Sequence, residues 1–229
     1  MKTNPYLLVF TVATLAFSCE KEVLPESMTK QDRYSPQMYI QQAEQALAAD
    51  AAAQLDLNFR SDPVVVPAGS TDALQEAVEA AGEGGTVLLE AGLHKESATV
   101  LISERVRITG EEGAVLEFDS DDTSDFPYVA EPALHVKDAS RVVIEGLTIM
   151  DTDTSGSVAI LIESSFLTRI KDNRLIGYEN SIVNQFGEST RVHGNEILSP
   201  KPLGGFGILS VNGKAFYAYN NYILAGNAG

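Results

Sequence analysis

The sequence predicts an all-β chain in which short strands stack in successive coils, and two observations support this. Short apolar runs recur four times between residues 133 and 224, and their first apolar residues are 26, 22 and 26 positions apart. These residues are Leu134, Ile160, Ile182 and Ile208. A second run follows each one at a constant distance and takes the same steps, through Leu147, Asn173, Asn195 and Asn221. Such a period of alternating apolar residues is typical of a solenoid, in which no repeat buries its apolar face alone.

Asn occupies one register position in three of the four repeats. Because Asn tolerates the left-handed conformation, we expect these residues to form a tight bend and to bond the next coil through their amides. An Asn ladder of Asn173, Asn195 and Asn221 predicts a right-handed parallel β-helix. From about residue 63 to residue 229 the chain resembles the pectate-lyase-like family of right-handed parallel β-helix repeat proteins. The alternatives are leucine-rich repeats, whose Leu-rich signature is absent, and a β-sandwich, which does not keep such a register.

The first 19 residues have the features of a cleaved export signal. Lys2 precedes an apolar run that ends at Ser18, which is too short to span a bilayer, and Cys19 follows directly. The segment resembles a bacterial lipoprotein signal peptide with Cys19 as the lipidated residue, although Ala16 and Phe17 depart from the usual pattern. A soluble secretory signal with an incidental Cys is the alternative. The resemblance implies a cell-envelope lipoprotein of the outer membrane, either periplasmic or surface-exposed.

Residues 20–61 are predicted to form a tether that contains a helix. The first part is polar and includes Pro25 and Pro36, whereas residues 38–57 are rich in Ala and Gln with a partial helical stripe. This helix is expected to lie against the domain or to project from the membrane anchor. The β-helix is predicted to occupy residues 62–229.

A short amphipathic helix is predicted at the start of that domain. It begins after a cap at Ser70 or Thr71 and ends at Gly82. One face carries Leu74, Ala77, Val78 and Ala81. As an N-terminal capping helix it would cover the open end of the solenoid and protect the first strand edge. At the other end the last repeat reaches Leu224 with no closing helix, which predicts an exposed terminal coil or the front part of a longer solenoid.

All length variation among the repeats falls in one connection. The variable segments are residues 150–159, 176–181 and 198–207. Insertions confined to one corner of a solenoid form a rim of loops, which is where repeat proteins commonly bind their ligands.

The first run places candidate catalytic residues on the outer strand face, where residues alternate inward and outward. Leu161 and Val183 are expected to point outward here, as is His135. Lys137 and Glu163 share the next outward column. His135 or Lys137 could act as a base, and Glu163 with Asp151 or Asp153 could hold a cation, Ca²⁺ being the candidate. The alternative is an ion pair of Lys137 and Glu163 on a solvated face.

The acidic segment 119–125 is a second place for Ca²⁺, with a solvated acidic loop as the alternative. Its spacing lacks the Gly and the terminal Glu of an EF-hand loop.

The second run places candidate substrate-binding residues in two further outward columns. Basic residues and tyrosines gathered on an acidic protein can grip an acidic sugar chain, although solvated surface residues are the alternative. One column is Arg169, Arg191 and Tyr217, and the other is Lys171, His193 and Tyr219.

Composition excludes several classes of function. The formal net charge of −16 argues against nucleic acid as a partner, and one Cys allows no internal disulfide. Nucleotide-binding, zinc-protease and nucleophile-elbow motifs are absent. The sequence therefore predicts a lipoprotein whose β-helix binds an extended, acidic polysaccharide. Two alternatives stay open, a polysaccharide lyase or glycosidase acting on uronate polymers and a structural or adhesive surface protein, and the oligomeric state also stays open.

Overall fold

The computed structural model describes residues 58–119, 132–152, 158–199 and 205–225. The chain divides into two compact units, Met1–Asn58 and Phe59–Gly229, and the second contains the fold described below. Cys19, the predicted helix in 38–57, Asp153 and most of the acidic segment 119–125 lie outside the described residues. The predictions made for them therefore stay predictions.

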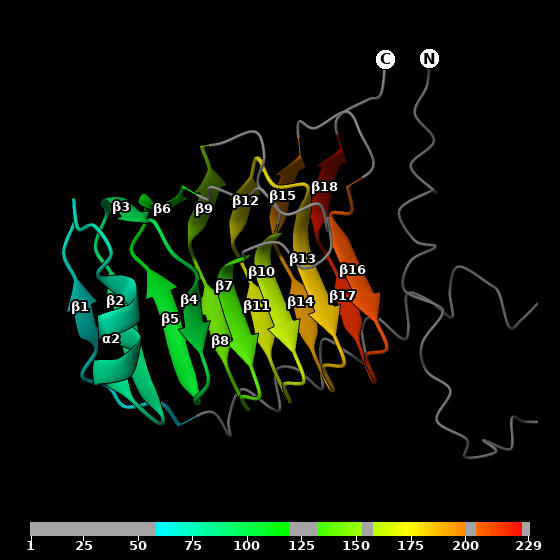
Figure 1. The fold of residues 1–229 in the computed structure, drawn as a ribbon, viewed down its shortest axis with the longest axis horizontal. Helices are drawn as coiled ribbons and strands as arrows, with labels where there is room; N and C mark the ends of the chain where they lie inside the picture. Colours follow the sequence, from blue (N-terminus) through cyan, green and yellow to red (C-terminus); the bar gives the residue numbers. More distant parts are fainter. Residues whose placement is uncertain (1–57, 120–131, 153–157, 200–204, 226–229) are drawn as a thin grey trace, which may run out of the picture. The chain divides into compact units, whose positions relative to one another are not determined.

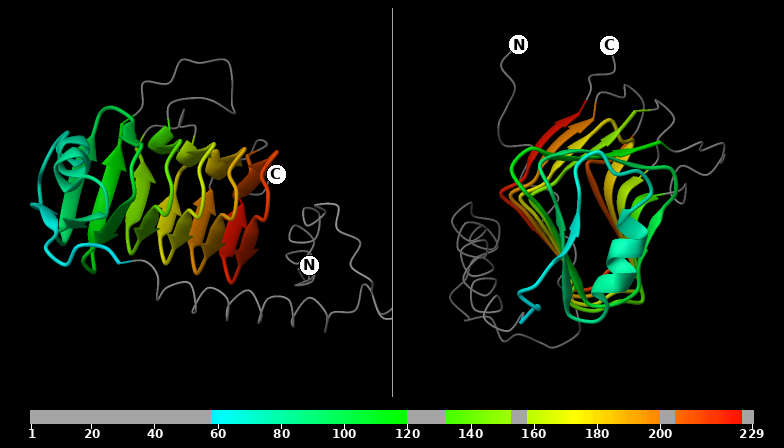
Figure 2. Two further views of the ribbon diagram at one scale, coloured as in Figure 1. Left: turned by 90° about the horizontal axis from the view of Figure 1, so that it is seen from below. Right: turned by 90° about the vertical axis from the view of Figure 1, so that its left-hand side faces the viewer.

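Three parallel sheets surround a common apolar core (Figures 1 and 2). Sheet A consists, in spatial order, of β1 (Val64–Val66), β2 (Gly85–Leu89), β5 (Val106–Gly110), β8 (Val143–Glu145), β11 (Arg169–Lys171), β14 (Arg191–His193) and β17 (Tyr217–Tyr219). Sheet B consists of β3 (Gly92–Glu96), β6 (Ala114–Phe118), β9 (Thr148–Asp151), β12 (Arg174–Ile176), β15 (Glu196–Ser199) and β18 (Tyr222–Ala225). Sheet C consists of β4 (Val100–Ile102), β7 (Pro132–Lys137), β10 (Val158–Glu163), β13 (Asn180–Gln185) and β16 (Ile208–Val211).

Each complete coil contributes one strand to each sheet, so the predicted all-β parallel β-solenoid is confirmed. Strand pairing also confirms the register. Ile160 lies between Leu134 and Ile182, and Ile182 pairs in turn with Ile208. The right-handed sense of the coil stays a prediction.

The Asn ladder joins consecutive coils. Asn173 N–H donates to Asn195 Oδ1 at 3.0 Å, and Asn195 N–H donates to Asn221 Oδ1 at 3.0 Å. The side-chain amides donate across the corner as well, Asn195 Nδ2 reaching the Ile170 carbonyl at 2.9 Å. In the first repeat, Leu147 N–H donates to Asn173 Oδ1 at 3.1 Å, so the ladder bonds a coil that lacks the Asn.

The expected left-handed conformation of the ladder residues is wrong. Positive φ falls on the preceding residue in every repeat, namely Gly146 (69°), Asp172 (55°), Gly194 (68°) and Asn220 (53°). The bend is therefore formed one residue earlier, because the ladder Asn must keep its side chain inside the coil to reach its neighbours.

A second repeated corner connects sheet C to sheet A after β7, β10, β13 and β16, and it bends at two residues in each of these four coils. The first bending residue is Asp138, Ser164, Phe186 or Asn212, with φ between 49° and 57°. The second is Arg141, Leu167, Ser189 or Ala215, with φ between 50° and 59°. Isolated bridges link Ser140, Phe166, Glu188 and Lys214 between these bends. We call this feature the CA corner.

The predicted helix is present as α2 (Leu74–Ala81), and its predicted face is the buried one. Its expected cap is wrong, since Ala73 is the N-cap residue and makes no side-chain bond. Glu96 at the end of β3 serves instead, because its Oε1 accepts from Ala73 N–H at 3.1 Å and Leu74 N–H at 2.9 Å. The helix contacts β1, β2 and β4. Its role as a cover for the solenoid end stays a prediction.

Candidate functional site

The structure brings together the three candidate catalytic residues on the outer face of sheet C. Glu163 on β10 pairs in register with Lys137 on β7, and His135 lies two residues before Lys137. His135 Nε2 lies 2.9 Å from Glu163 Oε2, and Lys137 Nζ lies 3.3 Å from the same oxygen. We call these three residues the sheet C cluster.

Burial lowers the pKa of His135, although Glu163 opposes that effect. A neutral imidazole beside a carboxylate has the composition of a general base and its orienting partner. The same contacts also form the predicted cross-strand ion pair, and half of the Lys137 side chain faces solvent. This geometry therefore permits acid–base chemistry and does not require it.

The structure does not bring Asp151 to the sheet C cluster. Asp151 ends β9 and lies against Gly177, near the start of β10, whereas Glu163 is the last residue of that strand. The six residues of β10 cover about 17 Å. Among the described residues, no three His, Cys, Asp or Glu side chains gather closely enough to hold a metal ion.

Asp151 instead lies near Tyr178, a fully buried tyrosine that follows Gly177. Burial raises the pKa of Tyr178 well above its usual range, and the Asp151 carboxylate adds to the effect. Both residues belong to the corner before sheet C, so Asp151 lies at the opposite end of that sheet's strands from Glu163.

The two columns predicted on sheet A are present in the expected register. Arg169 pairs with Arg191, which pairs with Tyr217, and Lys171 pairs with His193, which pairs with Tyr219. The His193 and Tyr219 rings stack with centroids 4.9 Å apart and planes 5° from parallel. These six residues form the sheet A cluster.

The members of the sheet A cluster differ in exposure. Arg169 is only 5% exposed and Tyr219 only 9%. Arg191 and His193 are half-buried, and Tyr217 is 39% exposed. The accessible part of the cluster is therefore Tyr217 together with the half-buried Lys171, Arg191 and His193. The buried members, Arg169 and Tyr219, lie beside them on neighbouring strands.

Glu145 is a functional neighbour that the sequence reasoning missed. It lies in the same column as Lys171, and its carboxylate pairs with Lys171 Nζ at 2.7 Å and with the Arg107 guanidinium. Burial would raise the pKa of Glu145, but the two cations outweigh it and the pKa is lowered. Glu145 precedes Leu147 by the same two residues by which Lys171 precedes Asn173, so the register contained the signal.

Outward side chains on sheet C are less exposed than expected. Leu161 and Val183 are 3% and 2% exposed and form a small apolar cluster with Val158 and Leu209, separate from the main core. Apart from His135, which pairs in register with Leu161, the polar side chains on the outer face of sheet C lie in its last column, which contains Lys137, Glu163 and Gln185.

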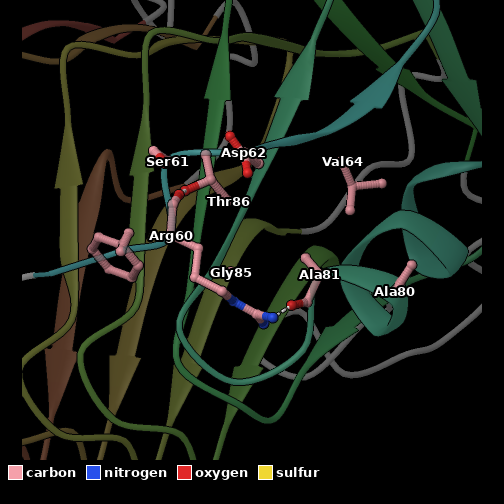
Figure 3. Close-up of a pocket in the computed structure, with 9 residues that line it drawn as sticks. Arg60, Ser61, Asp62, Val64, Ala80, Ala81, Gly85 and Thr86 are labelled. Carbon is pink, nitrogen blue, oxygen red and sulfur yellow. Dashed lines mark hydrogen bonds between the residues drawn. The ribbon is translucent and has the colours of Figure 1, made fainter.

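A surface pocket opens beside the first coil, between the chain entering the fold and the end of α2 (Figure 3). Arg60 crosses it and donates from Nη2 to the Ala81 carbonyl and, at 3.1 Å, to the Glu83 carbonyl. Thr86 Oγ1 donates to the Arg60 carbonyl at 3.0 Å. These bonds satisfy carbonyls at the helix C-terminus, so the structural role of Arg60 accounts for its position.

These features define the protein as a parallel β-solenoid with two polar clusters on adjacent outer faces. Comparison with protein-family models, curated proteins and solved structures gives no match. No helix within the described residues is long and apolar enough to cross a membrane.

Proposed function

We propose that this protein binds an extended, acidic polysaccharide along the outer face of sheet A. The observation that carries the proposal is the combination of Arg191 and Tyr217 with the stacked pair His193 and Tyr219 on adjacent strands. Guanidinium groups bind carboxylates, and aromatic rings pack against the apolar faces of sugars.

Local charge supports an acidic ligand. The two outward columns of sheet A contain four basic side chains and one acidic side chain, in a protein whose formal net charge is −16. The basic residues are Arg107, Arg169, Lys171 and Arg191, and the acidic residue is Glu145. Arg107 and Lys171 pair with Glu145, whereas Arg169 and Arg191 lie side by side on adjacent strands, where like charges repel. The excess of basic over acidic side chains in these columns favours a polyanion.

Neighbouring strands of a sheet are about 4.8 Å apart. Arg191 and Tyr217 are therefore one strand spacing apart, so a single short segment of an acidic sugar chain can contact both side chains. A right-handed β-helix of the pectate-lyase-like kind, lipidated at Cys19 and held at the outer membrane, is part of the same proposal and rests on the sequence resemblances.

A second candidate is a lyase acting on uronate polymers. The contact of His135 Nε2 with Glu163 Oε2 at 2.9 Å favours it, because the imidazole is held in place and kept neutral by burial. A cation beside the uronate would need ligands besides Glu163. Among the described residues, no three His, Cys, Asp or Glu side chains gather there.

The test is binding of the full chain to polygalacturonate, alginate and a neutral glucan. The double variant Arg191→Ala with Tyr217→Ala should bind the acidic polymers about tenfold or more weakly, since truncating an anchoring Arg or Tyr commonly costs more than about 1 kcal/mol. Added salt should weaken wild-type binding. Equal binding of the neutral polymer would overturn the proposal.

Sheet B provides a matched control. Arg174 and Tyr222 lie in one outward column there, two coils apart, whereas Arg191 and Tyr217 share a column of sheet A on adjacent coils. Arg174→Ala with Tyr222→Ala removes the same side-chain types and should leave binding unchanged. Release of unsaturated product, followed by absorbance and abolished in Glu163→Gln, would favour the lyase instead.

A further inference from the structure

Two phenylalanines are exposed at the CA corner on adjacent coils. Phe166 is 44% exposed and Phe186 is 53% exposed. The residues equivalent to Phe166 are Ser140, Glu188 and Lys214, and those equivalent to Phe186 are Asp138, Ser164 and Asn212. In the other coils that form this corner, the equivalent positions hold small or polar residues. The turn therefore does not require the aromatic rings.

Phe186 also adopts an unfavourable backbone conformation. Its φ of 57° is in the left-handed region, which bulky side chains rarely occupy. Asp, Ser and Asn at the equivalent positions tolerate that region better. An exposed ring buries little apolar surface to offset this cost. Strained residues of this kind concentrate at ligand-binding sites.

The two rings lie between the polar clusters already described. Phe166 is three residues after Glu163 and three before Arg169. Phe186 follows Gln185, which pairs in register with Glu163. The CA corner thus joins the sheet C cluster to the sheet A cluster, and the aromatic rings lie on the path between them.

We infer that Phe166 and Phe186 form an aromatic subsite at which the bound polysaccharide crosses the CA corner from sheet A toward Lys137. This inference rests on the proposed function and extends it to a second face. The apolar faces of pyranose rings pack on the two phenyl rings, and the sugar carboxylates are left to Arg191 on one side and Lys137 on the other.

The experiment replaces each ring by the residue that the same corner carries in another coil. Phe186→Asn copies Asn212, and Phe166→Ser copies Ser140. Binding of the full chain to polygalacturonate, or to whichever acidic polymer the wild type prefers, is measured together with the melting temperature. We expect about fivefold weaker binding for each variant. Phe186→Asn should also raise the melting temperature, because Asn fits the left-handed conformation better.

If Phe186→Asn weakens binding while it raises the melting temperature, the role of Phe186 is in ligand binding and not in stabilising the fold. Phe206→Ser is the control, since Phe206 is also 44% exposed and lies outside the CA corner. If both corner variants bind the acidic polymer as tightly as the wild type does, the aromatic subsite is overturned and the sheet A proposal stands. A wild type that binds no acidic polymer would overturn both. Weaker binding by the corner variants, with Phe206→Ser unchanged, would support the inference.

Discussion

The first and last described coils end their sheets in different ways (Figure 1). Beside β4, Gln75 of α2 takes the place of a neighbouring strand. Its Oε1 accepts from Leu101 N–H at 2.7 Å and its Nε2 donates to the Leu101 carbonyl at 3.4 Å. Beside β3, the backbone of Ser70 and Asp72 bonds Lys95. Edge groups of the first coil are thus satisfied by irregular chain and side chains.

The last described coil continues the core columns into half-buried positions. Ile182, Val192 and Ile197 are fully buried, but the residues that follow them in register are only partly buried. These are Ile208, Ala218 and Ile223. A repeat therefore buries only the core residues of the repeats beside it. The two ends of the described stack differ, because irregular chain and side chains bond the edge strands of the first coil, whereas the core residues of the last coil stay half-buried.

The largest test of this comparison is a pair of core truncations. Leu74→Ala in α2 removes a fully buried side chain and should lower the free energy of unfolding by about 2–5 kcal/mol. Ile223→Ala removes a half-buried one and should cost about 1 kcal/mol. Urea unfolding measures both values. Equal losses would mean that the last coil is as well packed as the first.

A second pair compares rungs of the Asn ladder. Asn195→Ala leaves Asn173 N–H and the Ile170 carbonyl without their side-chain partner. Since each unsatisfied buried polar group costs about 1–3 kcal/mol, we expect a loss of about 3 kcal/mol. Asn221→Ala lies in the half-buried last coil, where water can replace the amide, and should cost about half as much. Thermal unfolding of both variants provides the check.

The smallest effect concerns two carboxylates with opposite pKa shifts. Burial raises the pKa of Glu96 despite its two backbone bonds, so the first coil should gain stability from this group as pH falls toward the unfolded value of about 4.5. The pKa of Glu145 is lowered, so its contribution is present above about pH 4.5 and is lost as pH falls further.

Melting temperatures between pH 3.5 and 7 test these signs. Glu145→Gln should flatten the acid side of the profile, whereas Glu96→Gln should remove the gain that the wild type shows as pH falls toward 4.5. A Glu96→Gln profile parallel to that of the wild type would contradict the assigned direction.

Periodicity was sufficient to predict the fold, because a solenoid places residues one period apart side by side. The pairing of Leu134 with Ile160, the Asn ladder and the buried face of α2 all follow from that rule. Features that depend on contacts between unlike positions were missed. Glu96 bonds the start of α2 from more than 20 residues away and lies in no repeated motif, so Ser70 or Thr71 was the natural expectation for the cap.

The candidate site was predictable to the same extent. Columns such as Lys171 and His193 follow from register, and so does the proximity of Lys137 and Glu163. Exposure does not, because it depends on what packs over each face, and Leu161 and Arg169 are buried for that reason. Asp151 and Glu163 lie at opposite ends of the strands of sheet C. The repeat period predicts which residues lie side by side on neighbouring coils, but it does not predict this separation along the strands.

Pairing between coils has a mechanical consequence. Every ladder bond in the three sheets joins one coil to the next, so the bonds point along the stack. For a molecule anchored at one end and pulled at the other, the coils are links in series, and tension loads the strand pairings between each coil and the next. Failure is then progressive, because coils peel away one at a time. Between Ile144 and Ala218 each coil releases 22 or 26 residues, and the protein lengthens in steps instead of rupturing at once.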